Sequence, residues 1–121
     1  MTLTEEIVAA MGAHGHWKGR LRAAVDKGTS TFTVSTVAVD NLCDFGKFLH
    51  TKVDPVARQS AHWRRCQDLH ARFHKEAARV LQLALAWKKQ LAEEAMNAHS
   101  EFAKLSRALA AAMLKWRSAA T

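Results

Sequence analysis

The stretch Asp54–Trp87, DPVARQSAHWRRCQDLHARFHKEAARVLQLALAW, decides the fold of this 121-residue chain. Its apolar residues return every three or four positions, which is the period of one face of an α-helix. Asp54 and Pro55 suit the N-cap and the first position of that helix. The predicted inner face comprises Val56, Gln59, Trp63, Cys66, His70, Phe73, Ala77, Val80, Ala84 and Trp87. Ligand-type side chains therefore stand on a face that should be buried.

Two further helical faces flank this stretch. The first is predicted to start near Thr4 and to stop at Gly28, with an inner face of Ile7, Met11, His14, Lys18, Leu21 and Val25. The second comprises Leu91, Ala95, Ala98, Phe102, Leu105, Leu109, Ala112 and Trp116. Because its phase differs from that of the central helix, we expect a break near Ala86–Gln90.

The region between the first two long helices is less regular. Thr29–Thr36 alternates β-branched and polar residues, but the chain has no second alternating run to pair with, so we expect an extended loop. Asp40 is predicted to cap a short helix that ends near Thr51, contains Leu42, Cys43, Phe45, Phe48 and Leu49, and carries the cysteine in its first turn. The fold class predicted is all-α, an up-and-down four-helix bundle with a metal site between helices, in one domain of residues 1–121.

Composition narrows the function classes. The chain has 18 Lys and Arg against 11 Asp and Glu, a net charge of +7, but these basic residues are scattered and form no long run. Without a helix-turn-helix signature, nucleic-acid binding is not expected. No apolar stretch is long enough to span a bilayer and the first residues do not resemble a signal peptide, so we expect a cytoplasmic protein without membrane insertion.

Four side chains form the candidate metal site. His70 and His74 lie one helical turn apart on the same side of the central helix, a spacing that lets two imidazoles bind one ion. In a chain with seven histidines such a pair is weak evidence alone. His14 on the first inner face and Cys43 on the short helix complete a set of three imidazoles and one thiolate. This set suits tetrahedral Zn²⁺ and leaves no open position, which favours a structural or sensory role over catalysis.

The chain has other cysteine, histidine and aromatic residues that could take part in the site or pack in the core. Cys66 could replace a ligand, but burial as a small apolar side chain is favoured. The remaining histidines are expected to be solvated or to lie at the rim, namely His16, His50, His62 and His99. The aromatic residues are expected to pack in the core or between helices, namely Trp17, Trp63, Trp87, Trp116 and Phe102. A metal-dependent enzyme with an open zinc position is the alternative function, but Ala71 follows His70 where a His-Glu-x-x-His motif needs glutamate.

Three motifs occur in order along the chain: His14-x-x-Trp17-Lys18-x-x-Leu21, Cys43-x-x-Gly46-Lys47-Phe48-Leu49 and His70-x-x-Phe73-His74. With this spacing the chain resembles the chemoreceptor zinc-binding (CZB) domain family. Phe48 stands where the family commonly has tryptophan. The resemblance implies a four-helix bundle that holds Zn²⁺ through His14, Cys43, His70 and His74.

The resemblance also implies a functional context. CZB domains are usually attached to bacterial chemoreceptors or diguanylate cyclases and are often homodimers. The resemblance therefore implies a sensory module, not an enzyme, that modulates chemotaxis or cyclic-di-GMP signalling through zinc occupancy or through oxidation of the zinc-bound cysteine. A signalling protein is the expected partner.

Overall fold

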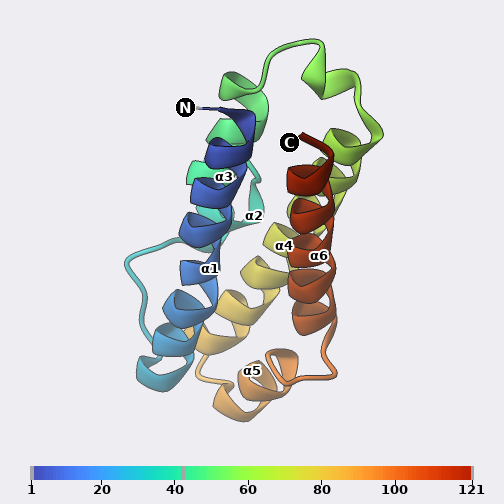
Figure 1. Ribbon diagram of the computed structural model, residues 1–121. Coiled ribbons are helices and arrows are strands. Elements are labelled where there is room, and N and C mark those ends of the chain that lie inside the picture. Colours follow the sequence, from blue (N-terminus) through green and yellow to red (C-terminus); the bar gives the residue numbers. More distant parts are fainter. Residues whose placement is uncertain (1, 42, 121) are drawn as a thin grey trace.

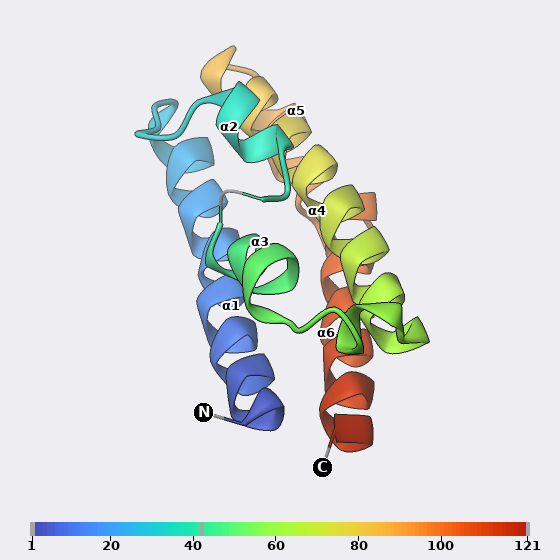
Figure 2. The same cartoon turned by 90° about the horizontal axis from the view of Figure 1, so that it is seen from above.

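The computed structural model describes residues 2–41 and 43–120, and within them every regular element is a helix and none is a strand. The three long helices are α1 (Leu3–Lys27), α4 (Ala61–Leu85) and α6 (Glu101–Ala120), which lie alongside one another (Figure 1). Helices α1 and α4 run in the same direction and α6 runs in the opposite one. The start of α1 and the end of α6 therefore lie at one end of the molecule, as Figure 2 also shows.

Helix α1 has strong signals at both ends. The Thr2 hydroxyl accepts a hydrogen bond from the backbone N–H of Glu5 at 3.2 Å, so the cap lies two residues before the predicted start at Thr4. Gly28 ends the helix with φ +70°, as predicted, and its N–H donates to the carbonyl of Ala24. A side chain is strained at this φ.

The connection between α1 and α4 differs from the prediction in two places. The extended loop ends at Thr33, because the Thr33 hydroxyl caps a short helix, α2 (Val34–Ala38), by accepting from the N–H of Thr36. The next helix, α3 (Asp44–Lys47), is capped by Cys43, so the prediction that Asp40 caps it is wrong. Leu42, expected within this helix, lies outside the described residues.

The short helix continues for a second turn of unusual geometry. Helix α3 runs directly into a π-helix, η1 (Phe48–Lys52), so the segment ends within one residue of the predicted end near Thr51. Figure 2 shows α2 and α3 lying across the space between α1 and α4. One side of the bundle is thus formed by short helices, where the prediction had a fourth helix of one piece.

Helix α4 starts later than predicted. The Asp54 carboxylate accepts from the N–H of Ala57 at 2.9 Å, but this bond caps a single 3₁₀ turn, η2 (Ala57–Gln59). Ser60, in an extended conformation, then caps α4 by accepting from the N–H of Trp63 at 3.1 Å. Val56, predicted for the inner face, is consequently 77% exposed.

The predicted break after the central helix is confirmed. Helix α4 ends at Leu85, and Trp87 adopts a positive φ of 62°. A short helix that the sequence analysis did not predict, α5 (Lys89–Ala95), then crosses the end of the bundle before α6 begins (Figure 1). Trp87 is 76% exposed, so its predicted place in the core is wrong.

The core lies between the three long helices and includes most of the predicted inner faces. Its largest fully buried apolar side chains are Ile7, Phe45, Leu49, Phe73, Leu81, Phe102 and Leu109. Trp116 and Trp17 are also buried, as predicted. None of the described helices is both long and apolar enough to cross a membrane.

Candidate metal centre

Three buried histidines meet between α1 and α4. His14 comes from the middle of α1, and His70 and His74 come from the middle of α4. Their exposed fractions are 8%, 0% and 1%. Each offers a ring nitrogen, and these three atoms lie within 4.8 Å of one another, close enough for a single metal ion to bind all three.

The helical spacing accounts for half of this arrangement. His70 and His74 are four residues apart, so their rings stand on the same side of α4, and the two Nε2 atoms lie 3.0 Å apart. His14 reaches them because it shares the inner face of α1 with Ile7 and Leu21, both buried. The packing of α1 on α4 then closes the three-imidazole group.

Cys43 places its thiol beside two of these imidazoles. Its Sγ lies 3.2 Å from Nε2 of His70 and 3.3 Å from Nε2 of His74. As the N-cap of α3, the same sulfur accepts a hydrogen bond from the N–H of Gly46 at 3.3 Å. The short helix thus holds the sulfur at the site and directs partial positive charge toward it, which favours a thiolate there.

Gly46 lets the chain close tightly around the sulfur. A Cβ at this position would overlap the carbonyl oxygen of Asp40 and approach the Cα of Asn41 to 3.0 Å. The loop that leads into Cys43 therefore passes directly over α3 at a point where only glycine fits. The Cys-x-x-Gly spacing was visible in the sequence, but the close approach was not.

Helix α2 orients one imidazole. Nδ1 of His74 lies 2.9 Å from the carbonyl oxygen of Val37, so this nitrogen carries the proton and donates it. The ring then presents the lone pair of Nε2 toward His70 and Cys43. Carbonyl partners of this kind are usual for metal-binding histidines, because they fix the tautomer and the ring orientation.

More than half of this sequence matches one known protein family. Residues 14–81 match the chemoreceptor zinc-binding domain family. The chain belongs to the CZB family. The matched range includes His14, Cys43, His70 and His74, the four residues of the candidate centre. Comparisons with curated proteins and with solved structures gave no match.

The electrostatics of the CZB site keep its imidazoles neutral. Burial, with a smaller contribution from His74, lowers the pKa of His14 to about 3. Burial and the neighbouring histidines lower the pKa of His70 to about 2, and burial also lowers the pKa of His74. Neutral imidazoles have a free lone pair at neutral pH, which is the form that binds a metal.

Two observations test whether zinc fits these residues. Nε2 of His14 is buried and has no hydrogen-bond partner among the described residues, which is costly for a polar atom unless something binds it. Burial raises the pKa of the Cys43 thiol, although the N–H groups of Gly46 and Phe45 oppose this shift. A bound cation would satisfy the first group and stabilise the thiolate of the second, so three imidazoles and one sulfur fit Zn²⁺.

A second polar pair lies near the CZB site and was not anticipated. Nε2 of His50 is 3.5 Å from a carboxylate oxygen of Asp40, and both side chains are partly buried. Asp40 raises the pKa of His74 and His50 lowers that of His70, so both lie within electrostatic reach of the site. His50 is half-buried, which agrees with the expected solvated or rim position.

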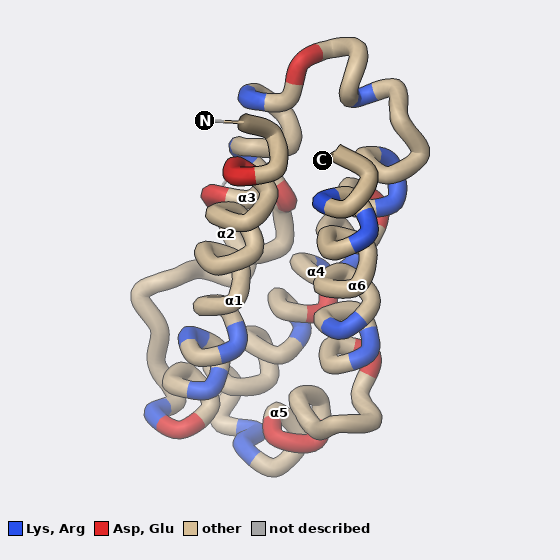
Figure 3. The backbone as a smooth tube through the Cα atoms, viewed as in Figure 1, with Lys and Arg blue, Asp and Glu red and all other residues tan. Residues whose placement is uncertain are grey.

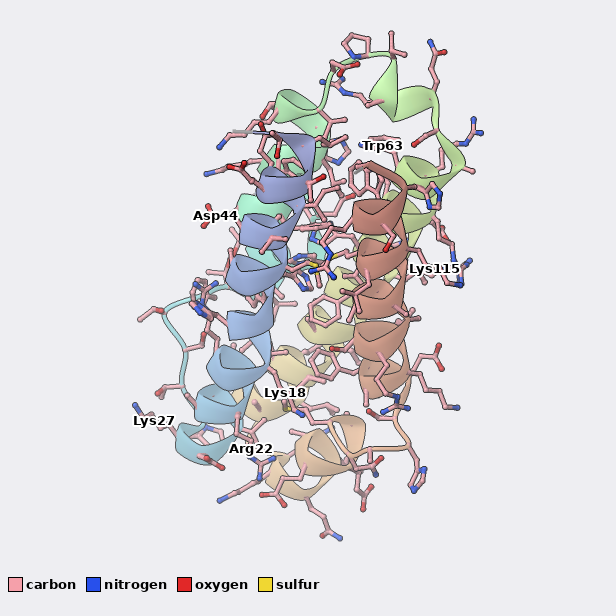
Figure 4. All side chains as sticks on the ribbon, viewed as in Figure 1. Lys18, Arg22, Lys27, Asp44, Trp63 and Lys115 are labelled. Atoms are coloured by element: carbon pink, nitrogen blue, oxygen red, sulfur yellow. The ribbon has the colours of Figure 1, made fainter. Side chains whose placement is uncertain are left out.

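The other candidate residues lie away from solvent or away from the site. Cys66 is fully buried, as the preferred reading predicted, and burial raises its pKa to about 11. His16, His62 and His99 are exposed, as predicted. Lys18, which shares the predicted inner-face spacing of the first helix, is exposed (Figure 4).

Proposed function

We propose that His14, Cys43, His70 and His74 bind one Zn²⁺ ion and that this domain is a sensory or regulatory module. The observation that carries the proposal is the convergence of three imidazole nitrogens within 4.8 Å, with the Cys43 sulfur 3.2 Å from one of them and 3.3 Å from a second. These donors come from α1, α3 and α4, so a bound ion would join three separate parts of the fold.

Four protein donors would leave no position for substrate, which supports regulation over catalysis. Zinc supplies a fixed positive charge that keeps the thiol deprotonated when bound. His74 stays oriented by Val37, and the rings of Phe45 and Phe73 exclude water: they lie 4.7 Å from the ring of His70 and 4.5 Å from that of His14. The chain's own contribution is thus a pre-oriented donor set that these two rings shield from water on one side.

Family membership supports a place in bacterial signalling, with chemotaxis or cyclic-di-GMP as the output. We propose that a change at the site alters the position of α3, because Cys43 is both a donor and the N-cap of that helix. The input is zinc occupancy or oxidation of Cys43, and the domain acts in the cytoplasm as a homodimer with a signalling protein as partner. The basic residues are spread over α1, α4 and α6 (Figure 3), which argues against a nucleic-acid surface.

Zinc stoichiometry tests the proposal. Purified protein is expected to hold about one zinc per chain, and alanine at position 14, 43, 70 or 74 is expected to reduce zinc retention strongly. His99→Ala and Cys66→Ala are the matched controls, since one residue is exposed and the other is a buried thiol outside the set. Unchanged zinc content in all four variants would reject the ligand assignment.

The spectrum of a cobalt-substituted sample tests the closed geometry. Intense visible bands with a sulfur-to-cobalt charge-transfer band are expected for four-coordinate N₃S ligation. The charge-transfer band should disappear in Cys43→Ser while His99→Ala keeps it. A weak five- or six-coordinate spectrum in the unsubstituted chain would point instead to an open position, as in the metal-dependent enzyme alternative.

A further inference from the structure

A cavity of about 190 Å³ reaches the candidate site from the surface. Cys43 and His74 line its inner part, and Trp17, Arg20 and Phe32 line it as well. It adjoins a second cavity of about 360 Å³, and the two share Arg20 and Phe32. Arg20 therefore stands where the surface cavities meet the route to the thiol.

The guanidinium of Arg20 is held by aromatic packing. Its central carbon lies 5.0 Å from the centre of the Trp17 ring and 5.4 Å from that of Phe32, and the two rings are themselves 5.4 Å apart. Cation–π contacts of this kind fix the charge in place. Among the described residues no carboxylate pairs with Arg20, so its N–H groups are available to an anion.

The charges around the two cavities are of both signs but unequal. Lys27 adds a second cation to the outer cavity, and its rim also carries the hydroxyl residues Thr29, Ser30 and Thr31. Asp44 is the one acidic residue among the described residues that line either cavity, and it is exposed to solvent. Arg20 and Lys27 are exposed as well, so solvent and salt screen all three charges, and the cavities keep an excess of one positive charge.

From this arrangement we infer that Arg20 makes the cavity an entrance selective for small anions, which it guides to the Cys43 thiol. The inference deepens the proposed function, on which it rests for naming Cys43 as the responsive group. It assigns Arg20 as a specificity-determining residue and gives the chemical class of reagent or ligand that reaches the sulfur. Neutral reagents of the same size would gain nothing from the guanidinium.

Two alkylating probes of nearly equal size test this selectivity. Iodoacetate is an anion and iodoacetamide is neutral, and with either one the Cys43 thiolate forms an S–C bond while iodide leaves. The ratio of their rates at Cys43, measured by peptide mass spectrometry so that Cys66 is counted separately, cancels differences in thiolate fraction. We expect Arg20→Gln to lower this ratio about two- to five-fold, the range for one charge at short distance in a partly screened site.

Matched variants change charge at other places. Asp44→Asn should move the ratio in the opposite direction, because it removes the negative charge from the cavity. Lys115→Gln changes the net charge as Arg20→Gln does, but Lys115 lies on the opposite side of the molecule from Asp44 (Figure 4), so the ratio should not change. The measurement uses chelator-treated protein if circular dichroism shows that chelation leaves its helical content unchanged. If chelation lowers the helical content, untreated protein is used.

Each result of the alkylation experiment either supports or overturns the inference about Arg20. A ratio that falls no further in Arg20→Gln than in Lys115→Gln overturns the inference, as does a fall in both rates with the ratio unchanged, which would make Arg20 a packing residue only. Zinc content of Arg20→Gln should equal that of the unsubstituted chain. If the protein binds no zinc but Arg20→Gln still lowers the ratio of the two alkylation rates, the proposed zinc site is wrong and the anion-selective entrance is supported. The zinc proposal and the present inference can therefore fail separately.

Discussion

The close approach at Gly46 allows a sharp prediction about how the thiol is positioned. A methyl group at this position overlaps the carbonyl oxygen of Asp40 and comes within 2.8 Å of its carbonyl carbon. Both are backbone atoms and cannot rotate away, so Gly46→Ala must move the loop that leads to Cys43. Overpacking of this kind costs about 1–3 kcal/mol, against a gain of about 1 kcal/mol from the better helix propensity of alanine.

We therefore expect Gly46→Ala to lower the free energy of unfolding by up to about 2 kcal/mol. Because the N–H of Gly46 also donates to Cys43 Sγ, zinc affinity should fall about 10–100-fold, the usual effect of losing an outer-shell contact. Chelator competition measures the affinity, and urea unfolding of chelator-treated protein measures the stability.

Gly12→Ala is the matched control, since a Cβ there meets no atom within 4 Å. The same substitution in the exposed face of α1 should stabilise the chain by about 0.5–1 kcal/mol and leave zinc affinity unchanged. The reasoning would be refuted if the two glycine variants behaved alike, with Gly46→Ala stabilising and zinc affinity intact.

Three further predictions concern the helix end, the buried thiol and the metal. Gly28→Ala should lower the free energy of unfolding by about 1–2 kcal/mol, because φ is +70° and the new Cβ would lie 2.9 Å from Cζ3 of Trp87. The double variant Gly28→Ala/Trp87→Ala should regain part of this stability in thermal unfolding. If it regains none, the Trp87 ring is not involved. Burial raises the pKa of Cys66 from 9.0 to about 11, so the unfolded chain loses this proton first as the pH rises. The stability of the unsubstituted chain relative to Cys66→Ala should then fall by about 1.4 kcal/mol between pH 7 and pH 10, and a pH-independent difference in urea unfolding would contradict this. Chelator treatment should lower the melting temperature of the unsubstituted chain by about 10 °C, since zinc at a hundred times its Kd contributes about 2.7 kcal/mol. The melting temperature of Cys43→Ala should fall by far less. If calorimetry shows the same fall in both proteins, zinc does not bind at the proposed site.

Local patterns predicted the long helices well. The four-residue spacing of His70 and His74, the inner-face position of His14 and the stop at Gly28 all depend on neighbours within a turn or two, and the structure has each of them as expected. The break after α4 was also visible, because two periodic faces of different phase cannot belong to one straight helix.

The short helices were harder to predict because their ends depend on distant contacts. Asp54 and Ser60 are both good N-caps, and local sequence does not decide which of them starts α4. Trp87 continues the inner-face spacing, yet the chain turns at that residue and leaves it exposed. The donation from His74 to Val37 joins residues 37 positions apart, and no periodic pattern reports such a bond.

These long-range contacts are the ones through which the proposed regulation would act. The connection between α1 and α4 has only short helices of its own, and helices this short are not stable alone. Among the described residues of this connection, Val37 and Cys43 make hydrogen-bond contacts with the histidines of the candidate centre, Val37 with His74 and Cys43 with His70 and His74. If zinc binds as proposed, the sulfur contact becomes a coordinate bond, and removing or oxidising that sulfur releases α3 at its N-cap while the long helices keep their own core. The response to zinc loss should therefore begin in residues 34–52, and hydrogen exchange should rise there before it rises in α4.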